Sequence, residues 1–549
     1  MATETFQDIL NGFNLATNGV LVLTSTVAAL AIYLILSRCR RDRRWEKYGV
    51  KHVDVGLRRL PEPVCRFLMK EHGPTAGYSR DRDSLVLVTS DLNLLKQILI
   101  KDFNNFANRN DSLPTKSPFG QGLFFLQDND WKRIRQLMSP SFSTGKLKRI
   151  STHIQDAANR LSQVFQKCAD TGANLKLLHT IGQYSTAIIA RTAFGLEADS
   201  IGEEEDDQFT YYTKTMFKRR SNLYAFLLSI FVGFGEFRTF LIHRVGIHYL
   251  DAVTRRSSDY FQAILKESIA EREVVERQSS RHVNNDFLQS LVSTMVASEV
   301  AQRPEGEMAP NESDILEKNK VPNSSQKNKV PNPSQKKISK DEIIAQSMLT
   351  IFAAYETTSS SLQFCLYMLA KNPDVQEKVY EEILDVVEHE DPTHEDLAKL
   401  TYMGQVLDET LRLFPPVSVI SRKASETRTY GDITIPAGAV IQIPIKEIQR
   451  DPAYYSNPEV FDPERFSPEN KATRNPLAFI PFGQGPRLCI GMRLAYLEVK
   501  TALVQVLRKV KVELNDTTVP RKGEDITLIY VGTPRIAKPI ELAVKLRGD

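Results

Sequence analysis

A ten-residue turn near the C-terminus carries the residues best suited to chemistry. In Phe482–Gly491 (FGQGPRLCIG), three glycines and a proline surround a single cysteine, Cys489. Glycines permit close approach of the backbone and dihedral angles that other residues avoid. The turn precedes a predicted helix over 492–509, whose dipole and free N–H groups favour a thiolate, the form of cysteine that binds metals. Because a lone cysteine is usually a small buried apolar residue, the prediction rests on the whole pattern.

A polar trio forms the second candidate. The SKDE sequence at 339–342 is a capping-box pattern, and it predicts the start of a helix over 340–371. This helix is apolar nearly all round, so we expect it to cross the centre of the protein. Glu356, Thr357 and Thr358 interrupt the apolar run. Polar groups are costly in the middle of a buried helix, which makes a function the better explanation for them.

Helices must position these residues, because helical periodicity dominates the chain after Asp91. Two of the helices carry charged residues in regular spacing: WKRIR at 131–135, and Glu409 with Arg412 three positions later. Taken alone, the latter is a solvated pair that contributes a few tenths of a kcal/mol. The predicted helices cover 92–98, 131–137, 147–165, 185–193, 249–272, 340–371, 394–414 and 492–509, and the predicted strands cover 83–88, 420–422, 433–435 and 440–443.

Together these patterns resemble the cytochromes P-450. FGQGPRLCIG at 482–491 resembles the haem-thiolate loop, AAYETT at 353–358 the central-helix motif, and WKRIR at 131–135 the helix that contacts a haem propionate. TYMGQVLDETLRLFPP at 401–416 resembles the ExxR helix, and PERF at 463–466 is a further match. The resemblance covers nearly the whole chain and looks most like the microsomal drug- and steroid-oxidising clan that includes the vertebrate third family and thromboxane synthase.

The resemblance implies a mainly α fold with small β-sheets, the cytochrome P-450 fold, in a single catalytic domain. It also implies haem b (iron protoporphyrin IX) with the Cys489 thiolate as axial ligand, which favours O–O cleavage. Gly485 and Gly491 would let the loop lie flat beneath the porphyrin. The other haem-binding residues implied are Trp131, Arg135, Arg487, Arg422, Arg109, Phe482 and Gly485. Arginine suits the paired oxygens of propionates because its fork is planar and always charged.

Catalytic roles follow by the same resemblance for Thr357 and Glu356. The Thr357 hydroxyl can donate and accept hydrogen bonds, and it can bond back to the Ala353 carbonyl, while Glu356 is a titratable neighbour. A buried charge triad is implied for Glu409, Arg412 and Arg465. Two departures from the family pattern are Ala354, where glycine is usual beside the oxygen-binding kink, and Gln449, where histidine is usual.

The implied activity is NADPH-dependent monooxygenation, which inserts one oxygen atom from O2 into a lipophilic steroid, fatty acid or xenobiotic. NADPH–cytochrome P-450 reductase is the implied electron donor, with cytochrome b5 as a candidate second donor and Lys132, Arg133 and Arg493 as a candidate docking patch. Two alternatives stay open: an isomerase that rearranges a lipid endoperoxide without a reductase, and a non-catalytic haem-binding protein. Candidate substrate contacts are Leu123, Phe124, Phe125, Phe352, Ala353, Val417 and Leu528.

The N-terminus predicts a membrane anchor. Residues 19–37 contain no charge and would span roughly 28 Å as a helix, close to the thickness of a bilayer core. Five arginines follow within residues 38–44, and by the positive-inside rule they keep the large C-terminal part cytosolic. We therefore expect a lumenal segment over 1–18, a basic juxtamembrane linker over 38–63, and a catalytic domain over 64–549 at the endoplasmic reticulum membrane.

Composition and repeats complete the prediction. The chain has 549 residues, with 71 basic against 67 acidic residues, so its net charge gives no indication of nucleic-acid binding. The five cysteines are few and scattered, which favours a reducing compartment. The segment 301–337 contains a tandem repeat, KNKVPNSSQ then KNKVPNPSQ, and is too polar to offset its ordering entropy. We expect a disordered insertion there.

Overall fold

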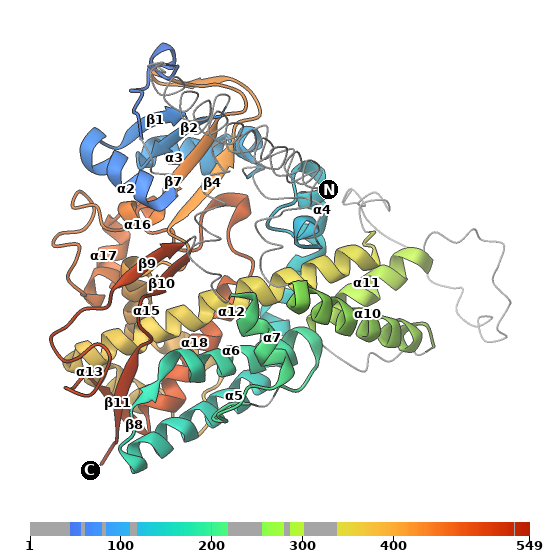
Figure 1. Cartoon of the computed structure of the whole chain (residues 1–549), viewed down its shortest axis with the longest axis vertical. Coiled ribbons are helices and arrows are strands. Elements are labelled where there is room, and N and C mark those ends of the chain that lie inside the picture. Colours follow the sequence, from blue (N-terminus) through green and yellow to red (C-terminus); the bar gives the residue numbers. More distant parts are fainter. Residues whose placement is uncertain are drawn as a thin grey trace, which may run out of the picture.

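The computed structural model describes residues 44–55, 61–79, 84–109, 118–198, 200–217, 255–278, 286–300, 337–531 and 533–548. Within them helices predominate and the sheets are small, which confirms the predicted mainly α class (Figure 1). The helices are α2 (Pro61–His72), α3 (Leu92–Lys96), α4 (Asp128–Met138), α5 (Thr144–Thr171), α6 (Leu177–Phe194), α7 (Gln208–Met216), α10 (Arg255–Gln278), α11 (Phe287–Val300), α12 (Lys340–Lys371), α13 (Pro373–Val386), α14 (His394–Lys399), α15 (Thr401–Leu413), α16 (Ile445–Ile448), α17 (Pro468–Thr473) and α18 (Met492–Leu507).

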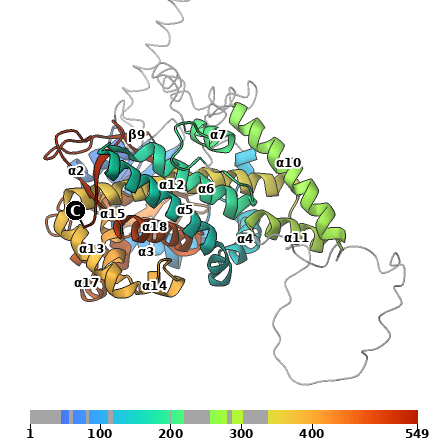
Figure 2. The same ribbon diagram turned by 90° about the horizontal axis from the view of Figure 1, so that it is seen from below.

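Helix α12 is the centre of the fold, and its bounds are those that the sequence predicts. The capping box at its start is present: the Glu342 N–H donates to the Ser339 hydroxyl, and the Ser339 N–H donates to the Glu342 carboxylate at 2.9 Å. Figure 1 shows α12 in yellow crossing the whole molecule, with α6 alongside it. In Figure 2, α5 and α18 lie close together beside it. Most of α12 is buried, as its apolar surface requires.

The predicted helix over 394–414 was wrong in one respect, because the chain forms two helices there. Helix α14 ends at Lys399, Leu400 takes an extended ψ of 81°, and α15 begins at Thr401. The break buries the Leu400 side chain completely, and the Lys500 ammonium donates to the carbonyls of Leu397 and Leu400 at 2.9 and 2.8 Å. Those bonds satisfy carbonyls that a helix end leaves without partners.

The largest sheet has the strand order β1-β2-β7-β4 and lies above α12 in the view of Figure 1. Strands β2 and β7 pair in parallel, and the other neighbours are antiparallel. Its strands are β1 (Thr75–Ser79), β2 (Leu85–Thr89), β7 (Val440–Pro444) and β4 (Val419–Lys423). The remaining strands are β3 (Leu175–Lys176), β8 (Val510–Glu513) and β11 (Glu541–Leu546) in one sheet, with β5 (Arg428–Tyr430) and β6 (Ile433–Ile435), and β9 (Leu528–Val531) and β10 (Thr533–Ile536), as two pairs.

The packed body begins before residue 64, where the sequence prediction placed the start of the catalytic domain. The Trp45 side chain is completely buried in the core around the large sheet, and its indole N–H donates to the Tyr78 carbonyl at 3.2 Å. Val50 lies in the same core, and Val53 is buried against α2 and the sheet. Part of the predicted 38–63 linker therefore belongs to the folded domain.

Two predicted segments lie outside the described residues. They are the anchor at 19–37 and the insertion at 301–337, except for its last residue. Among the helices that the structure does describe, none combines the length and the apolar character that crossing a membrane requires.

Candidate functional site

The turn around Cys489 is a tight loop whose shape depends on two glycines. Gly483 and Gly485 both have a φ of +75°, in the left-handed region that favours glycine. The Cys489 N–H donates to the Phe482 carbonyl at 3.0 Å and closes the loop. Gly491 has a φ of −88°, which any residue can adopt. A positive φ is therefore required at Gly483 and Gly485, and it is not required at Gly491.

Gly485 also meets a steric requirement that Gly483 does not. A Cβ atom at Gly485 would lie 2.0 Å from the Leu99 carbonyl oxygen, which is a clash with backbone. At Gly483 the nearest atom would be the Ile420 Cδ1, at an ordinary contact distance of 3.8 Å. The loop is therefore pressed directly onto the backbone at Leu99, a residue that the sequence prediction did not name.

The Cys489 side chain is accessible to solvent but closely surrounded by protein. Burial therefore raises the pKa of its thiol. The N–H groups of Gly491 and Met492 hydrogen-bond the sulfur and oppose this rise in pKa, as do the charges of Arg135 and Arg109. The predicted effect of the helix start on the thiol is therefore present, but burial outweighs it. A cation on the open side would complete the stabilisation of a thiolate.

Four predicted haem-contact arginines gather around this thiol. Burial lowers the pKa of Arg109 well below its usual value, and the charges of Arg422, Arg487 and Arg135 lower it further, while Cys489 raises it. Burial lowers the pKa of Arg422 to about 10. Burial, followed by the charges of Arg422 and Arg135, lowers the pKa of Arg487 to about 9. Like charges brought together in this way need a counter-charge.

The protein itself supplies little of that counter-charge. Within the described residues, none of the four arginines forms an ion pair with a carboxylate. The buried Nε atoms of Arg109 and Arg422 have no hydrogen-bond partner. Asp128 is the acidic residue whose charge acts on Arg487. An anionic ligand with several oxygens would satisfy these donors.

Arg487 ties the cysteine loop to the segment before α4. Its guanidinium donates to the carbonyls of Ala107 and Leu126 at 2.9 and 2.8 Å, and it stacks over the Trp131 ring at 4.1 Å. Arg109 acts on the same segment, because it donates to the Phe124 carbonyl at 3.2 Å and its guanidinium lies 3.7 Å from the centre of the Phe124 ring. The sequence prediction assigned these arginines to binding an anion alone. In the structure they also donate hydrogen bonds to backbone carbonyls before α4.

Gln346 is a further clamp on this segment that the sequence prediction missed. Its amide donates to the Gln121 carbonyl at 2.8 Å and accepts from the Leu123 N–H at 2.7 Å. The side chain is completely buried on α12. A glutamine within an apolar stretch of the helix is the signal that could have indicated it, by the reasoning used for the polar trio.

Helix α12 has a polar and accessible face at Ala353 and Thr357. Ala353 is exposed although most of the helix is buried. The Thr357 hydroxyl donates to the Ala353 carbonyl at 2.7 Å, which confirms the predicted back-bond. Glu356 is half-buried, whereas Thr358 is buried on another side of the helix. Because Thr357 uses its proton on the backbone, its lone pairs remain to accept a hydrogen bond from the open side.

One apolar cluster brings the predicted segments together. It contains Trp131 from α4, Phe352 and Ala354 from α12, and Ile490, the residue after Cys489. Of the predicted substrate contacts, Leu123, Phe125 and Phe352 belong to this cluster, Phe124 and Ala353 are exposed, and Val417 and Leu528 are half-buried. The exposed apolar side chains among them are those available to a ligand.

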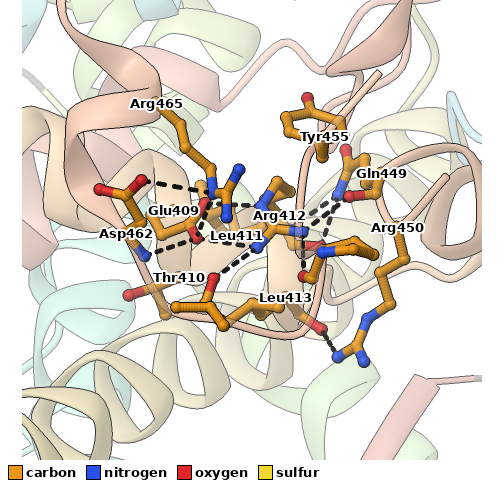
Figure 3. A network of polar contacts seen from close by, with 12 residues as sticks. Glu409, Thr410, Leu411, Arg412, Leu413, Gln449, Arg450, Tyr455, Asp462 and Arg465 are labelled. Carbon is orange, nitrogen blue, oxygen red and sulfur yellow. Dashed lines mark hydrogen bonds and ion pairs between the residues drawn. The ribbon is translucent and has the colours of Figure 1, made fainter. Parts of the chain in front are cut away.

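The predicted charge triad is present (Figure 3). Glu409 and Arg412 are both completely buried, and Arg412 Nε and Nη2 donate to the two carboxylate oxygens at 2.6 and 2.8 Å. Arg465 Nε lies 3.5 Å from the Glu409 carboxylate. Arg412 also donates to the carbonyls of Gln449 and Pro458 at 2.9 and 2.7 Å, so the pair organises backbone as well as charge.

Gln449, the departure from histidine, completes this network (Figure 3). Its amide donates to the carbonyls of Leu411 and Arg412 at 3.0 and 3.1 Å, and its oxygen accepts from the Ile480 N–H at 3.1 Å. Ile480 lies two residues before Phe482, where the cysteine loop begins. Glutamine has one acceptor and two donor hydrogens, and this site uses both functions. The side chain therefore joins the end of α15 to the start of the loop.

Comparison with known proteins agrees with this geometry. The Cytochrome P450 family profile matches residues 50–537 of the chain. The chain is a cytochrome P450. The P450 chain is 32% identical to cytochrome P450 3A29 from Sus scrofa over 493 residues, which cover 89% of this chain and 88% of the relative. It is 34% identical to cytochrome P450 3A7 from Homo sapiens, covering 84% and 83%, and 31% identical to thromboxane-A synthase from Sus scrofa, covering 92% and 95%.

The cofactor of this P450 is haem b with a cysteine thiolate as axial ligand. The residues present fit that group. The arginine cluster offers unsatisfied donors that suit the two propionates, and Cys489 offers an accessible sulfur whose charge acts on Arg109 of this cluster. The exposed faces of Ala353 and Phe124 suit a flat apolar ring system. No other described cysteine combines an exposed side chain with these arginines.

Substituting each of the two loop glycines by alanine distinguishes the effect of backbone strain at positive φ from the effect of a steric clash with Leu99. Both residues have the same positive φ, but only Gly485 has backbone in the position of the new Cβ. We expect Gly485→Ala to lose most of its bound haem, and Gly483→Ala to keep most of it at a lower melting temperature. The measurement is haem content per protein by absorbance, with calorimetry alongside. Equal haem content in the two variants would contradict the role assigned to Leu99.

Removal of the Gln449 amide should destabilise the protein and also loosen the cysteine loop. Gln449→Leu leaves buried backbone groups unsatisfied, which should lower the free energy of unfolding by about 3 kcal/mol. Gln376→Leu is the matched control, because Gln376 is equally buried and bonds to the backbone of Leu369 and Val512, away from the loop. Denaturation should show similar losses for both, whereas haem dissociation should accelerate only in Gln449→Leu. Equal haem dissociation rates would show that Gln449 does not hold the loop.

Proposed function

We propose that this P450 is a monooxygenase that inserts one oxygen atom from O2 into a lipophilic substrate, with electrons from NADPH through a reductase. The observation that carries the proposal is the accessible face of α12. There the Thr357 hydroxyl, bonded to the Ala353 carbonyl, provides a polar group beside exposed apolar surface. An isomerase that rearranges its substrate without external protons has no need of such a group.

Cys489 and the arginines have binding roles in this proposal. Cys489 supplies the axial thiolate, and the bound haem then supplies oxygen activation, in which the thiolate promotes O–O cleavage. Arg109, Arg135 and Arg422 bind the propionates. Arg487 and Trp131 hold the wall of the site, since Arg487 stacks on Trp131 and bonds the backbone around it. Phe482 and Gly485 shape the loop.

Thr357 and Glu356 deliver protons in this proposal. The Thr357 hydroxyl donates to the backbone, so it accepts a hydrogen bond from an O–H group or water on its open side. This acceptor orients the water that carries a proton into the site. Glu356, half-buried on the same turn of α12, exchanges protons with that water.

The substrate is lipophilic, because apolar side chains line the open side of the site. Phe124 is 44% exposed, a large value for an aromatic residue held by two contacts with Arg109. Ala353 adds a small apolar surface on α12, and Phe125 packs edge-on against Phe124 at 5.0 Å. A steroid, a fatty acid or a xenobiotic fits such a surface.

Electrons reach the site from NADPH–cytochrome P-450 reductase, with cytochrome b5 as a second donor. Lys132 and Arg493 are exposed and available to bind an acidic partner. Arg133, the third member of the predicted patch, forms ion pairs with Glu342 and Asp130 instead, so we leave it out. We place the enzyme at the endoplasmic reticulum membrane, anchored by residues 19–37 with the domain in the cytosol.

An isomerase is the second candidate, and the similarity to thromboxane-A synthase favours it, since that relative covers 92% of the chain. Isotope labelling separates the two functions. We would incubate the purified enzyme with reductase, NADPH, 18O2 and a panel of steroids and fatty acids. The proposal requires one 18O atom per product and a strict need for NADPH. Turnover of a fatty-acid endoperoxide without NADPH, and no labelled product from the panel, would establish the isomerase instead.

Proton delivery can be tested at Thr357. We expect Thr357→Ala to bind haem normally and still consume NADPH, but to form several-fold less product per NADPH and to release peroxide. Thr357→Ser should keep much of the wild-type yield because it keeps the hydroxyl. Ser361→Ala is the matched control: it removes another α12 hydroxyl that bonds back to the helix backbone, on a buried face. A wild-type product yield in Thr357→Ala would refute the role of this hydroxyl.

A further inference from the structure

Helix α3 continues directly into a π-helical turn at Gln97–Lys101. The Asp102 N–H donates to the Gln97 carbonyl at 2.8 Å and closes this turn. π-helices are rare, occur mostly as single turns, and are frequent at functional sites. The turn contains Leu99, whose carbonyl oxygen leaves no room for a Cβ atom at Gly485. The π turn is therefore the backbone against which the cysteine loop is pressed.

The Asp102 carboxylate is held by two side chains of β5, a strand far away in the sequence. Arg428 donates to one carboxylate oxygen at 2.6 Å, and the Tyr430 hydroxyl donates to the other. Burial raises the pKa of Tyr430 to about 12, and the hydrogen bond with Asp102 raises it as well, so the hydroxyl keeps its proton. The residue that closes the π turn is thus fixed to the β5–β6 hairpin through both of its carboxylate oxygens.

Asn105 ties the chain after the π turn to the residues just before the same hairpin. Its buried side-chain oxygen accepts from the N–H groups of Ser425 and Glu426 at 3.1 and 2.7 Å, and its amide donates to the Glu426 carbonyl at 3.2 Å. Further on, the Lys423 N–H donates to the Asn108 carbonyl at 2.9 Å. The next residue is Arg109, so these bonds fix the whole path from the π turn to the arginine cluster.

Apolar packing joins the hairpin and the π turn in one core. Leu99, Phe106 and Ile435 belong to the same buried cluster, and the Tyr430 ring lies 5.9 Å from the Phe106 ring. The Asp102 side chain is 19% exposed and that of Arg428 is 44% exposed. A fully exposed ion pair would contribute little, but a carboxylate buried to this extent is costly to leave without partners. The contact is therefore strong enough to hold the turn.

We propose that Asp102 is a positioning residue for the cysteine loop. The β5–β6 hairpin holds its carboxylate, its N–H closes the π turn, and the turn supports the loop through the Leu99 carbonyl. Asp102 thereby controls how firmly the loop presents the Cys489 thiolate. The inference goes beyond the proposed function and does not depend on it, because a monooxygenase and an isomerase of this family both need the thiolate.

The first test uses the haem as a reporter of the loop, without any turnover. Asp102→Asn keeps the size of the side chain and removes its charge. We expect haem to dissociate several-fold faster from this variant. Part of its reduced protein with carbon monoxide should lose the strongly red-shifted Soret band, because a loosened loop holds the thiolate less well. A wild-type dissociation rate together with an intact band would overturn the proposal.

Glu377→Gln is the matched control for this charge removal. Glu377 on α13 forms an ion pair with Arg547, which donates to both carboxylate oxygens at 3.0 Å and joins α13 to the end of β11. We expect this variant to lower the melting temperature about as much as Asp102→Asn and to keep the wild-type band and haem dissociation rate. Equal loss of the band in both variants would show a general effect of stability and would overturn the proposal.

Hydrogen exchange measured by mass spectrometry follows the loop itself in the haem-bound protein. Asp102→Asn should speed exchange in peptides that cover 97–106 and also in those that cover 482–491, which include the Cys489 N–H bonded to the Phe482 carbonyl. Glu377→Gln should leave both peptides unchanged. Faster exchange at 97–106 with wild-type exchange at 482–491 would overturn the proposal, because the turn would then not support the loop.

A double-mutant cycle tests whether Asp102 acts through the hairpin. Arg428→Met should also speed haem dissociation, and the double variant should be no faster than the faster single variant, because both changes remove the same contact. Independent, multiplying effects would overturn this step. Should Asp102→Asn not fold, Tyr430→Phe removes one hydrogen bond and keeps the ring on Phe106. Tyr430→Phe should lose haem faster than wild type, and a wild-type rate would refute the role of the hairpin.

Discussion

The positive charge buried beside Cys489 is the constraint on which the rest of the site depends. Four arginines lie close enough to depress one another's proton affinity, and buried Nε atoms of Arg109 and Arg422 have no partner in the protein. Such a cluster is unfavourable unless an anion compensates it. Haem b supplies two charges that stabilise the site. Its propionates are anions that compensate the arginines, and its iron is a cation that favours the thiolate form of Cys489 over the thiol.

The surrounding structure holds this arrangement from two sides. On one side, the Gln449 side chain accepts from the Ile480 N–H just before the cysteine loop, and Arg412 of the buried Glu409–Arg412 pair donates to the Gln449 carbonyl. On the other side, Gln346 on α12 fixes the segment that contains Phe124. The central helix therefore performs two tasks on different stripes of its surface: it holds the segment that contains Phe124, and it presents Thr357.

Sequence patterns predicted much of this architecture because local signals specify it. The capping box defined the start of α12. The spacing of Glu409 and Arg412 alone indicated a solvated pair, and the resemblance to the cytochromes P-450 implied the buried pair that the structure contains. The patterns could not show that Leu400 breaks a helix, because the break depends on Lys500 from α18. They also missed Gln346 and the Leu99 carbonyl, because contacts between distant segments leave little trace in a single sequence.

The most direct test of the central claim is the absorbance spectrum of the reduced protein with carbon monoxide. The full-length protein should show the strongly red-shifted Soret band that a thiolate trans ligand produces. Cys489→Ala should lose this band, whereas Cys365→Ala and Cys168→Ala, which change cysteines away from the arginine cluster, should keep it. Persistence of the band in Cys489→Ala would show that another residue ligates the iron and would contradict the account.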